Sequence, residues 1–472
     1  MTIRLLCAYD KYPANAIVSL DAGTEAGLIA AKTASASLTG GVTYYPPPTS
    51  KPLTAASGRF LNNVARQRTV GIAANAPIAG TFTLGRRAPG PFDAVRAVLT
   101  GAASSAVNTF KLSIATSAKY NNGYMPVSAA GAALPFTLFT FGTTDVENPR
   151  NPGGGAANTL IENASGSGVT LVEGSVSSDI LQHVSQDRTD IAGADPFYIL
   201  RLQGTNPPAK DILECSSASP NPFSSVIPEF YSGYWAGADY TTADPPGAPT
   251  QGWLPCVDLI FYLRGKVVYS IANAADSLGQ GWVPTSVVPQ FGGNINGWCR
   301  QMVAMLNDAG ITASYTALNN TGNYSEIFHN RAINALYSGG LTHLFLAPWS
   351  VNETANGVAG VVAALKRVSL IIGLAAQRRV KLILVRPWAG QGLDMTLFNM
   401  VQAYCDQYAA SGGTAADARE VVSADPASNN IRPEFAVRDA SGAIFDTIHL
   451  NNAGHEAVGR HFFNTRAAFA LS

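Results

Sequence analysis

The sequence is poor in charged residues and has no excess of either sign. Only 13% of its 472 residues are charged, and 31 basic side chains balance 31 acidic ones. A protein that binds nucleic acid through its phosphates normally presents a basic face, so this composition argues against that class of partner. We therefore expect no nucleic acid among the partners.

Cysteine is also scarce, and no common metal or cofactor signature is present. The five cysteines are widely spaced and form no CxxC pair: Cys7, Cys215, Cys256, Cys299 and Cys405. Such a set favours neither a zinc site nor a disulfide framework. His455 and His461 lie six residues apart rather than the four of an HExxH site, and no glycine-rich nucleotide signature opens a helix. We expect no metal and no cofactor.

Long apolar runs are missing as well. The N-terminus, MTIRLLCAYDKYPAN, lacks the apolar core and the small-residue cleavage site of a secretory signal. No run of about 18 apolar residues is apparent, which is the length that crosses a bilayer. We therefore expect synthesis in the cytoplasm and no membrane span.

The length predicts two or three domains. Composition and pattern change near two positions, which divides the chain into residues 1–50, 55–264 and 265–472. The first of these parts is too small to bury a core of its own. The other two are each long enough for an independent domain.

Residues 1–50 have the pattern of an arm. Asp21 is suited to cap a short helix that includes Glu25 and ends at Gly40-Gly41. The proline-rich run 44–48 would act as a stiff linker. The run 12–21, Tyr-Pro-x-x-x-Ile-Val-x-Leu-Asp, resembles the leading segments of phage structural proteins. That resemblance implies docking on a virion partner or on a second copy, whereas the alternative is an arm packed on the next domain.

Residues 55–264 have the pattern of an all-β domain. Short apolar runs, separated by turn clusters, are expected to form strands: 110–114, 135–142, 168–176, 196–204 and 257–265. Regular short strands predict a sandwich, of the jelly-roll type. The loops are rich in aromatic residues, namely Phe230, Tyr231, Tyr234, Trp235 and Tyr240. Such rings either stack on sugars or, as we prefer, fill the contact with the following domain.

From residue 265 onward, strands and helices alternate. The expected strands are 266–274, 311–318, 341–348, 380–387 and 418–423, and the expected helices are 298–306, 325–337, 357–377, 393–410 and a last one from 454 past 461. Alternating units of this kind predict a parallel sheet covered by helices on both faces, a three-layer α/β sandwich.

Chemically useful side chains follow these strands. Ser277 comes directly after the first buried strand, Asn352 comes after the third, and Asp446 precedes His449 by three residues. Each residue alone is weak evidence for catalysis, because an Asp-Ser pair usually caps a helix or forms a turn and a lone histidine is usually structural. Together they supply a nucleophile, a base, a group that orients the base and an oxyanion donor. No G-x-S-x-G is present, which excludes the α/β-hydrolase elbow.

These residues stand in sequence blocks that resemble those of the SGNH (GDSL-type) hydrolases. Ser277 lies in ADSLGQG, Asn352 in WSVNE and residues 446–459 read DTIHLNNAGHEAVG, with Ala275 and Ser350 where the family usually has glycine. The resemblance covers residues 265–472 and implies an SGNH/flavodoxin-like fold.

By this resemblance, Ser277 is the nucleophile, His449 the base and Asp446 the residue that orients it. The oxyanion would be held by the N–H of Ser277, the N–H of Gly322 and the amide of Asn352; Gly322 is chosen by its position after the second strand alone.

An SGNH-like domain behind a β-sandwich resembles carbohydrate esterases that remove O-acetyl groups from polysaccharides. This resemblance implies a serine esterase with that activity. With the arm, this suggests a phage virion protein acting on a bacterial surface glycan. Two alternatives stay open: a structural or glycan-binding virion protein with a vestigial hydrolase fold, and a lipolytic esterase.

Overall fold

The structure is a computed structural model. It describes residues 3–5, 17–18, 34–36, 64–68, 74–75, 80–101, 110–140, 174–178, 180–204, 214–217, 231–251, 253–255, 257–264, 269–281, 297–319, 322, 324–388, 394–424, 430–439 and 441–472.

Three short strands lie in the N-terminal arm. β1 (Ile3–Leu5) pairs antiparallel with both β2 (Ile17–Val18) and β3 (Ala34–Ala36). The helix expected to run from Asp21 to Gly40-Gly41 is therefore wrong at Ala34–Ala36, where pairing with β1 satisfies the backbone instead. The remainder of that predicted helix and the proline linker 44–48 lie outside the described residues.

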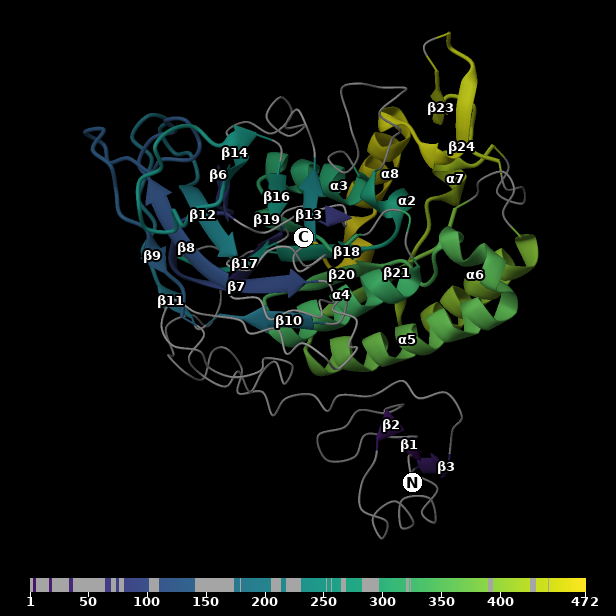
Figure 1. The fold of residues 1–472 in the computed structure, drawn as a ribbon. Helices are drawn as coiled ribbons and strands as arrows, with labels where there is room; N and C mark the ends of the chain where they lie inside the picture. Colours follow the sequence, from purple (N-terminus) through teal and green to yellow (C-terminus); the bar gives the residue numbers. More distant parts are fainter. Residues whose placement is uncertain are drawn as a thin grey trace.

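Antiparallel sheets follow, as predicted for the first half (Figure 1). Their strands are β4 (Val64–Arg68), β5 (Ala74–Asn75), β6 (Gly80–Arg87), β7 (Phe92–Gly101), β8 (Phe110–Ser117), β9 (Thr137–Leu138), β10 (Gly174–Ser177), β11 (Leu181–Gln182), β12 (Phe197–Gly204), β13 (Glu214–Ser217), β14 (Tyr231–Ala236), β15 (Thr250–Gln251), β16 (Trp253–Pro255) and β17 (Val257–Leu263). One sheet has the order β15-β14-β6-β12-β8-β9, a second has β10-β7-β17-β4 with β11 on β7, and a third has β16-β13-β5.

The two larger sheets pack against each other through aromatic side chains. Tyr198 of β12 contacts Phe261 of β17, in the other sheet, with ring centroids 5.2 Å apart. Within its own sheet, Phe261 also contacts Phe92 of β7 at 4.8 Å. Alternation along β12 and β17 places such rings between the sheets. The described residues thus form a β-sandwich, and its assignment as a jelly roll stays a prediction.

The aromatic residues near 235 pack within this β part. Trp235 contacts Tyr124 and Tyr240 with ring centroids 5.9 and 5.7 Å apart. The guanidinium of the fully buried Arg201 lies 5.4 Å from the centre of the Trp235 ring. We preferred the interpretation that these rings fill the contact with the next domain. For Trp235 this is wrong, because the ring packs against Arg201, Tyr124 and Tyr240 of the β part itself. Phe230 lies outside the described residues.

The second half contains the predicted parallel sheet. Its strands are β18 (Tyr269–Ala274), β19 (Ala313–Ala317), β20 (His343–Leu346), β21 (Lys381–Val385) and β22 (Thr414–Ala416), in the order β19-β18-β20-β21-β22. All neighbours are parallel. The order reverses direction between β18 and β20, and ligands of open α/β sheets bind at the carboxyl ends of strands at such a reversal.

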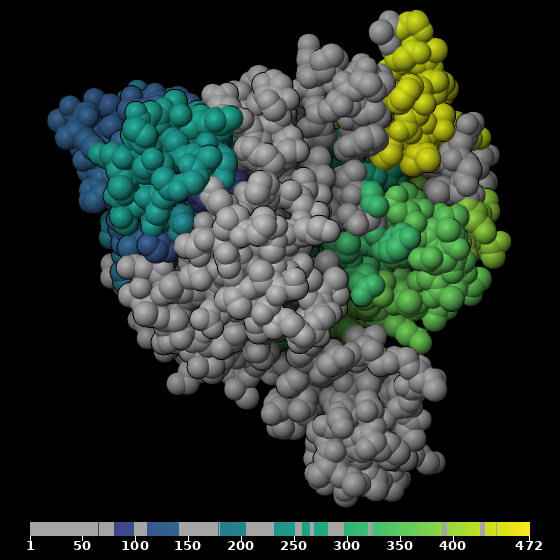
Figure 2. Space-filling view, viewed as in Figure 1, coloured from purple at the N-terminus to yellow at the C-terminus, as the bar shows by residue number. Residues whose placement is uncertain are grey.

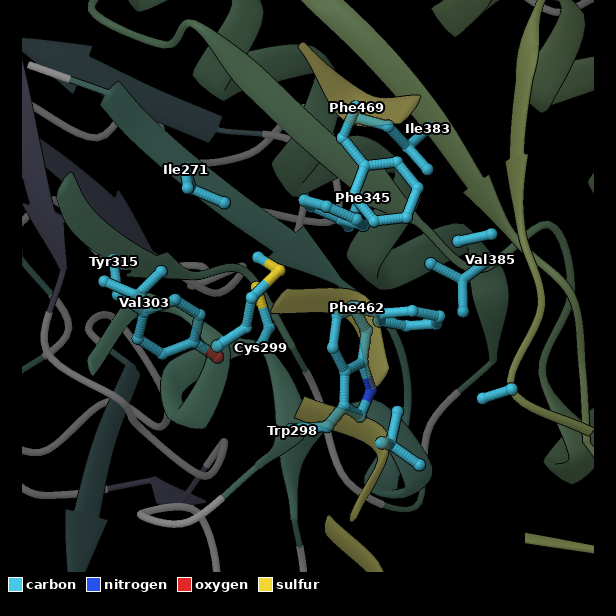
Figure 3. Close-up of a cluster of buried hydrophobic side chains, with 14 of the residues drawn as sticks. Ile271, Trp298, Cys299, Val303, Tyr315, Phe345, Ile383, Val385, Phe462 and Phe469 are labelled. Carbon is cyan, nitrogen blue, oxygen red and sulfur yellow. The ribbon is translucent and has the colours of Figure 1, made fainter. Parts of the chain in front are cut away.

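Helices cover both faces of this sheet. They are α2 (Ser277–Gln280), α3 (Trp298–Asp308), α4 (Ser325–Ser338), the 3₁₀ helix η2 (Val351–Asn356), α5 (Gly357–Gln377), α6 (Met395–Ala410), α7 (Arg419–Val422), α8 (Asn452–Asn464) and the 3₁₀ helix η3 (Arg466–Phe469). One core joins the sheet to α4, α5 and α6. The other joins it to α3, α7 and α8, with Trp298 set edge-on to Phe462 at 5.0 Å (Figure 3). The three-layer α/β prediction is confirmed.

The fifth strand lies before its predicted place. Residues 418–423 were expected to be a strand, but Arg419–Val422 is helical and the strand is Thr414–Ala416. Asp417 accepts a hydrogen bond from the backbone N–H of Arg419 and so favours a helical turn there. Val422 is buried in the core of that face, which explains its apolar character without a strand.

A hairpin absent from the prediction projects beside the sheet. β23 (Ala436–Arg438) pairs antiparallel with β24 (Ile444–Leu450), with two shifts of register. Figures 1 and 2 show it, in yellow, standing out from the body at the upper right. Ile444 and Phe445 are 45% and 55% exposed, so its outer end presents apolar side chains.

One helical stretch has the length and composition of a membrane span, whereas the expectation that the chain contains no span stays a prediction. Val351–Gln377, which covers η2 and α5, is long and apolar enough to cross a bilayer. In the structure, α5 places Val368, Ile371 and Leu374 in the core against the sheet. A helix packed in this way passes the same test, so the stretch alone is weak evidence for a span.

The β-rich and α/β parts are in contact. Strand β17 ends five residues before β18 begins, and β4 lies against β18 and β19. The β-rich part therefore packs against the β19–β18 edge of the parallel sheet, next to the strand that leads to Ser277. The division at residues 264 and 265 stays a prediction.

Candidate active site

Ser277 is the first residue of a short helical turn that directly follows β18. The carboxylate of Asp276 caps this turn by accepting a hydrogen bond from the N–H of Leu278 at 3.0 Å. The backbone must turn sharply here because the chain leaves a buried strand. Ser277 is 4% exposed and lies at the reversal of strand order, where a ligand site is expected.

The structure brings Ser277 together with His449. The ring Nε2 of His449 lies 2.8 Å from the Ser277 Oγ, although the two residues are 172 positions apart. Nδ1 of the same ring lies 2.6 Å from Oδ2 of Asp446. The two bonds place the imidazole between a hydroxyl and a carboxylate, which is the arrangement of a serine nucleophile, a base and an orienting acid.

Asp446 is fixed by its own backbone. Its Oδ1 accepts hydrogen bonds from the N–H groups of Ile448 at 2.7 Å and His449 at 3.0 Å. A single short segment of β24 therefore holds both the acid, Asp446, and the base, His449. Because Nδ1 donates to Asp446, the proton is held on that nitrogen and Nε2 is left to accept from Ser277.

The carboxyl group of Asp446 is held in its charged form. Burial raises the pKa of Asp446, but the hydrogen bonds from the ring and the backbone of His449 outweigh burial and bring the pKa below its usual value. An ionised carboxylate can stabilise the imidazolium that forms when His449 takes a proton.

Asp276 joins the two loops at the carboxyl ends of β18 and β20. Its Oδ2 accepts from the Ser350 hydroxyl at 2.8 Å and from the N–H of Val351 at 3.2 Å. Burial raises the pKa of Asp276, and these hydrogen bonds offset only part of the increase. The residue before Ser277 therefore sets the distance between the Ser277 turn and the Asn352 turn.

Asn352 is the second residue of η2 and lies beside this link. The Ser350 hydroxyl accepts from the backbone N–H of Asn352 at 3.2 Å and from its side-chain amide at 3.1 Å. Ser350, which stands where the SGNH pattern usually has glycine, thus orients the Asn352 amide while donating to Asp276. The substitution adds a hydroxyl that links the two turns.

A second buried link holds η2 against α4, the helix that precedes it in the chain. Oε1 of Glu353 accepts from both the N–H and the hydroxyl of Ser325, each at 2.7 Å, and so caps α4. Burial raises the pKa of Glu353. Arg367 lies 3.8 Å from the same carboxylate and compensates part of the buried charge.

Gly322 has a backbone conformation that suits glycine, but nothing in the structure ties it to Ser277. Its φ is 72°, and open space surrounds the position of a Cβ. It lies on an exposed turn between β19 and α4. Its part in an oxyanion hole stays a prediction.

Asp276, Ser350 and Glu353 were not assigned a role from the sequence. Asp276 carried a local signal, since an acid before a helical turn predicts a cap, and it does cap α2. Its bond to Ser350, 74 residues away, depends on the order of the strands. Glu353 follows Asn352 directly but acts on α4, which no local pattern indicates.

Four other histidines of the second half have structural surroundings. His329, His343 and His461 each bond through Nε2 to a backbone carbonyl, of Ala347, Phe469 and Asp417. Burial lowers the pKa of His455 to about 3. Within the described residues, no group of three or more His, Cys, Asp or Glu is placed to hold a metal ion.

With this geometry in place, solved structures offer a comparison. About two fifths of the chain matches solved lipolytic proteins of the G-D-S-L class. A G-D-S-L family member from Veillonella parvula is 16% identical and covers 42% of this chain and 98% of its own, with a TM-score of 0.32. The esterase EstA from Pseudoalteromonas is 10% identical and covers 43% and 98%, with a TM-score of 0.33.

A Bacillus subtilis protein, YxiM, extends over both halves. It is 12% identical and covers 87% of this chain and 90% of its own, with a TM-score of 0.35. No protein-family model matches the sequence, and no curated protein matches it significantly. At these identities and TM-scores, the matches carry no argument about substrate, which has to come from the site.

Proposed function

We propose that this protein is a serine ester hydrolase. The observation that carries the proposal is the continuous chain from Ser277 Oγ to His449 Nε2, 2.8 Å, and from His449 Nδ1 to Asp446 Oδ2, 2.6 Å. A hydrolase fold that had lost its activity would not require both of these hydrogen bonds. Their presence therefore favours an enzyme over a purely structural virion protein.

The first half of the reaction forms an acyl-enzyme. His449 Nε2 removes the hydroxyl proton as Ser277 Oγ bonds to the ester carbonyl carbon, and Asp446 stabilises the resulting imidazolium. The negative oxygen of the tetrahedral intermediate is met by the N–H of Ser277 and the amide of Asn352, with Gly322 as a further proposed donor. The carbon–oxygen bond to the alcohol then breaks, and the imidazolium gives its proton to the departing alcohol.

The second half releases the acid. Water takes the place of the alcohol, and His449 removes one of its protons as the oxygen attacks the acyl carbon. The bond to Ser277 Oγ breaks, and His449 gives the proton that it took from water to the serine. The original serine proton has left with the alcohol, so Ser277 and His449 end in their starting protonation states.

The proposed substrate is a short acyl ester, an O-acetyl group on a polysaccharide such as a bacterial surface glycan. The run 279–293 after Ser277 has Trp282 and Phe291 as its only rings. A lipase needs a large apolar surface to meet an interface. One observation favours the lipolytic alternative: Ile444 and Phe445, beside Asp446, are exposed.

Acyl length separates these two functions. With p-nitrophenyl esters, we expect kcat/KM to fall steeply from acetyl to butyryl to octanoyl. Acetylated glycans should release acetate, while the same glycans after chemical deacetylation provide the blank. Octanoyl esters that turn over faster than acetyl esters would contradict the deacetylase and favour a lipolytic esterase.

Residues 1–50 are proposed to attach the protein to a phage particle or to a second copy of the chain. The support is their short length, which is too small to bury a core, together with the proline run 44–48 and the phage-like run 12–21. Ser277, Asn352 and His449 all lie in the second half, so catalysis does not require the arm.

Removal of the arm tests this division. A chain that begins at residue 55 is expected to keep full kcat/KM on p-nitrophenyl acetate and to lose oligomerisation, measured by light scattering, or particle attachment. Its melting temperature should match that of the full chain. A folded truncation without esterase activity would show that the arm belongs to the catalytic architecture.

A further inference from the structure

A small apolar cavity lies at the carboxyl ends of β18, β20 and β21. Its volume is about 30 Å³, and its wall includes Leu278, Trp298, Trp349, Val351, Val385 and Trp388. A water molecule needs roughly 10–15 Å³ measured in this way, so the space holds about two atoms of that size.

The cavity adjoins both turns of the candidate active site. Leu278 follows Ser277 directly, and Val351 precedes Asn352. Asp276 also lines the cavity and holds the two turns together through the Ser350 hydroxyl and the N–H of Val351. Neither Ser277 nor Asn352 lines the cavity itself, but each lies next to a residue that does.

The reaction dictates which part of an ester faces this space. The departing alcohol must take its proton from His449 Nε2, so the alcohol side of the tetrahedral carbon faces His449. The acyl side then points away from the imidazole. His449 does not line the cavity, whereas Leu278 and Val351, the neighbours of Ser277 and Asn352 in the chain, do.

Three tryptophans limit the depth of the cavity. Trp298, Trp349 and Trp388 are 1%, 3% and 3% exposed. Trp298 is held edge-on by Phe345 at 5.5 Å and Phe462 at 5.0 Å (Figure 3), and close-packed rings of this kind do not move aside cheaply. A longer acyl chain would have to displace one of them.

We infer that this cavity is the acyl-binding pocket of Ser277, and that its tryptophans restrict the acyl group to acetyl or propionyl. The inference rests on the proposed ester hydrolysis. It adds the part of the molecule that selects the acid portion of the ester, independently of the alcohol to which the acid is attached.

The test enlarges the pocket without touching the reacting groups. Trp388→Leu is expected to raise the ratio of kcat/KM for p-nitrophenyl butyrate over acetate at least tenfold, because the removed ring leaves room for two further carbons. Val351→Ala, a smaller change on a partly buried side chain, should raise the same ratio several-fold. Neither variant should alter the ranking of acetate esters that differ only in their alcohol.

Trp235→Leu is the matched control, since this tryptophan is also buried, at 7% exposed, but lies in β14 of the sandwich. An active enzyme whose butyrate-to-acetate ratio stays unchanged in Val351→Ala and in folded Trp388→Leu would overturn the pocket and leave the esterase standing. A folded wild-type enzyme that hydrolyses no ester would overturn both.

Discussion

Alanine at Ser277 is expected to lower kcat by roughly 10⁴- to 10⁶-fold, and alanine at His449 by nearly as much. The two residues share the 2.8 Å hydrogen bond from hydroxyl to imidazole, so each is useless for proton transfer without the other. The double variant should therefore lose little more than either single variant. The measurement is kcat on p-nitrophenyl acetate for the three variants.

His461→Ala is the control for this series. His461 lies on α8, and its Nε2 bonds to the backbone carbonyl of Asp417 at 3.0 Å. Its loss should leave kcat close to that of the wild type. Losses at Ser277 and His449 that multiply in the double variant would show that His449 is not the base.

Asn352→Ala is expected to lower kcat by about 10²–10³, or roughly 2.7–4 kcal/mol of transition-state stabilisation, with little change in KM. The amide is oriented by the Ser350 hydroxyl at 3.1 Å and stands at the start of η2. Because the oxyanion exists only after Ser277 attacks, a donor to it affects the chemical step more than binding. Steady-state kinetics and a melting curve check the two expectations.

Thr354→Ala controls for damage to the turn. The Thr354 hydroxyl donates to the Val351 carbonyl at 2.7 Å within the same 3₁₀ helix, so its removal perturbs η2 without removing the amide. Its kcat should stay within a few-fold of wild type. An Asn352→Ala variant with an equally small loss would place Asn352 among the residues that only shape the turn.

The side chains that the structure brings together at the candidate site could be singled out from the sequence because each depends on a short local pattern. Ser277 follows a buried strand and a capping acid, and the spacing of Asp446 and His449 lets one segment supply both groups. Apolar runs of β-branched and large residues also identified β20 and β21. These signals survive in the fold because the sheet is buried on both faces.

Other elements are set by contacts between distant parts. Thr414–Ala416 contains two alanines and no apolar run, and it becomes a strand only because β21 offers an unpaired edge. Arg201 lies in a strand that reads as half exposed, yet it is fully buried against Phe136, 3.9 Å from the ring centre. The guanidinium is buried because loops from distant parts of the sequence fold over it. A short stretch of sequence around Arg201 does not contain those loops.

The β23–β24 hairpin carried a signal that could have been used. Asp439, Ser441 and Gly442 form a turn cluster between two short runs, and Asp439 accepts from the N–H of Ser441 at 2.8 Å. The segment precedes the Asp446 and His449 pair and fixes the course of the chain that carries it. Interpreting Asp439, Ser441 and Gly442 as the turn of a hairpin would have placed Asp446 and His449 on its second strand.

Covalent labelling of Ser277 tests the central claim most directly. A fluorophosphonate reacts with a serine only when a base activates it and an oxyanion site receives the phosphoryl oxygen. Incubation of the full chain with the probe, followed by peptide mapping, should find one labelled peptide containing Ser277, and His449→Ala should lose the label. A folded protein that stays unlabelled, or that is labelled at another serine, would contradict the assignment of Ser277, His449 and Asp446 as the reacting groups.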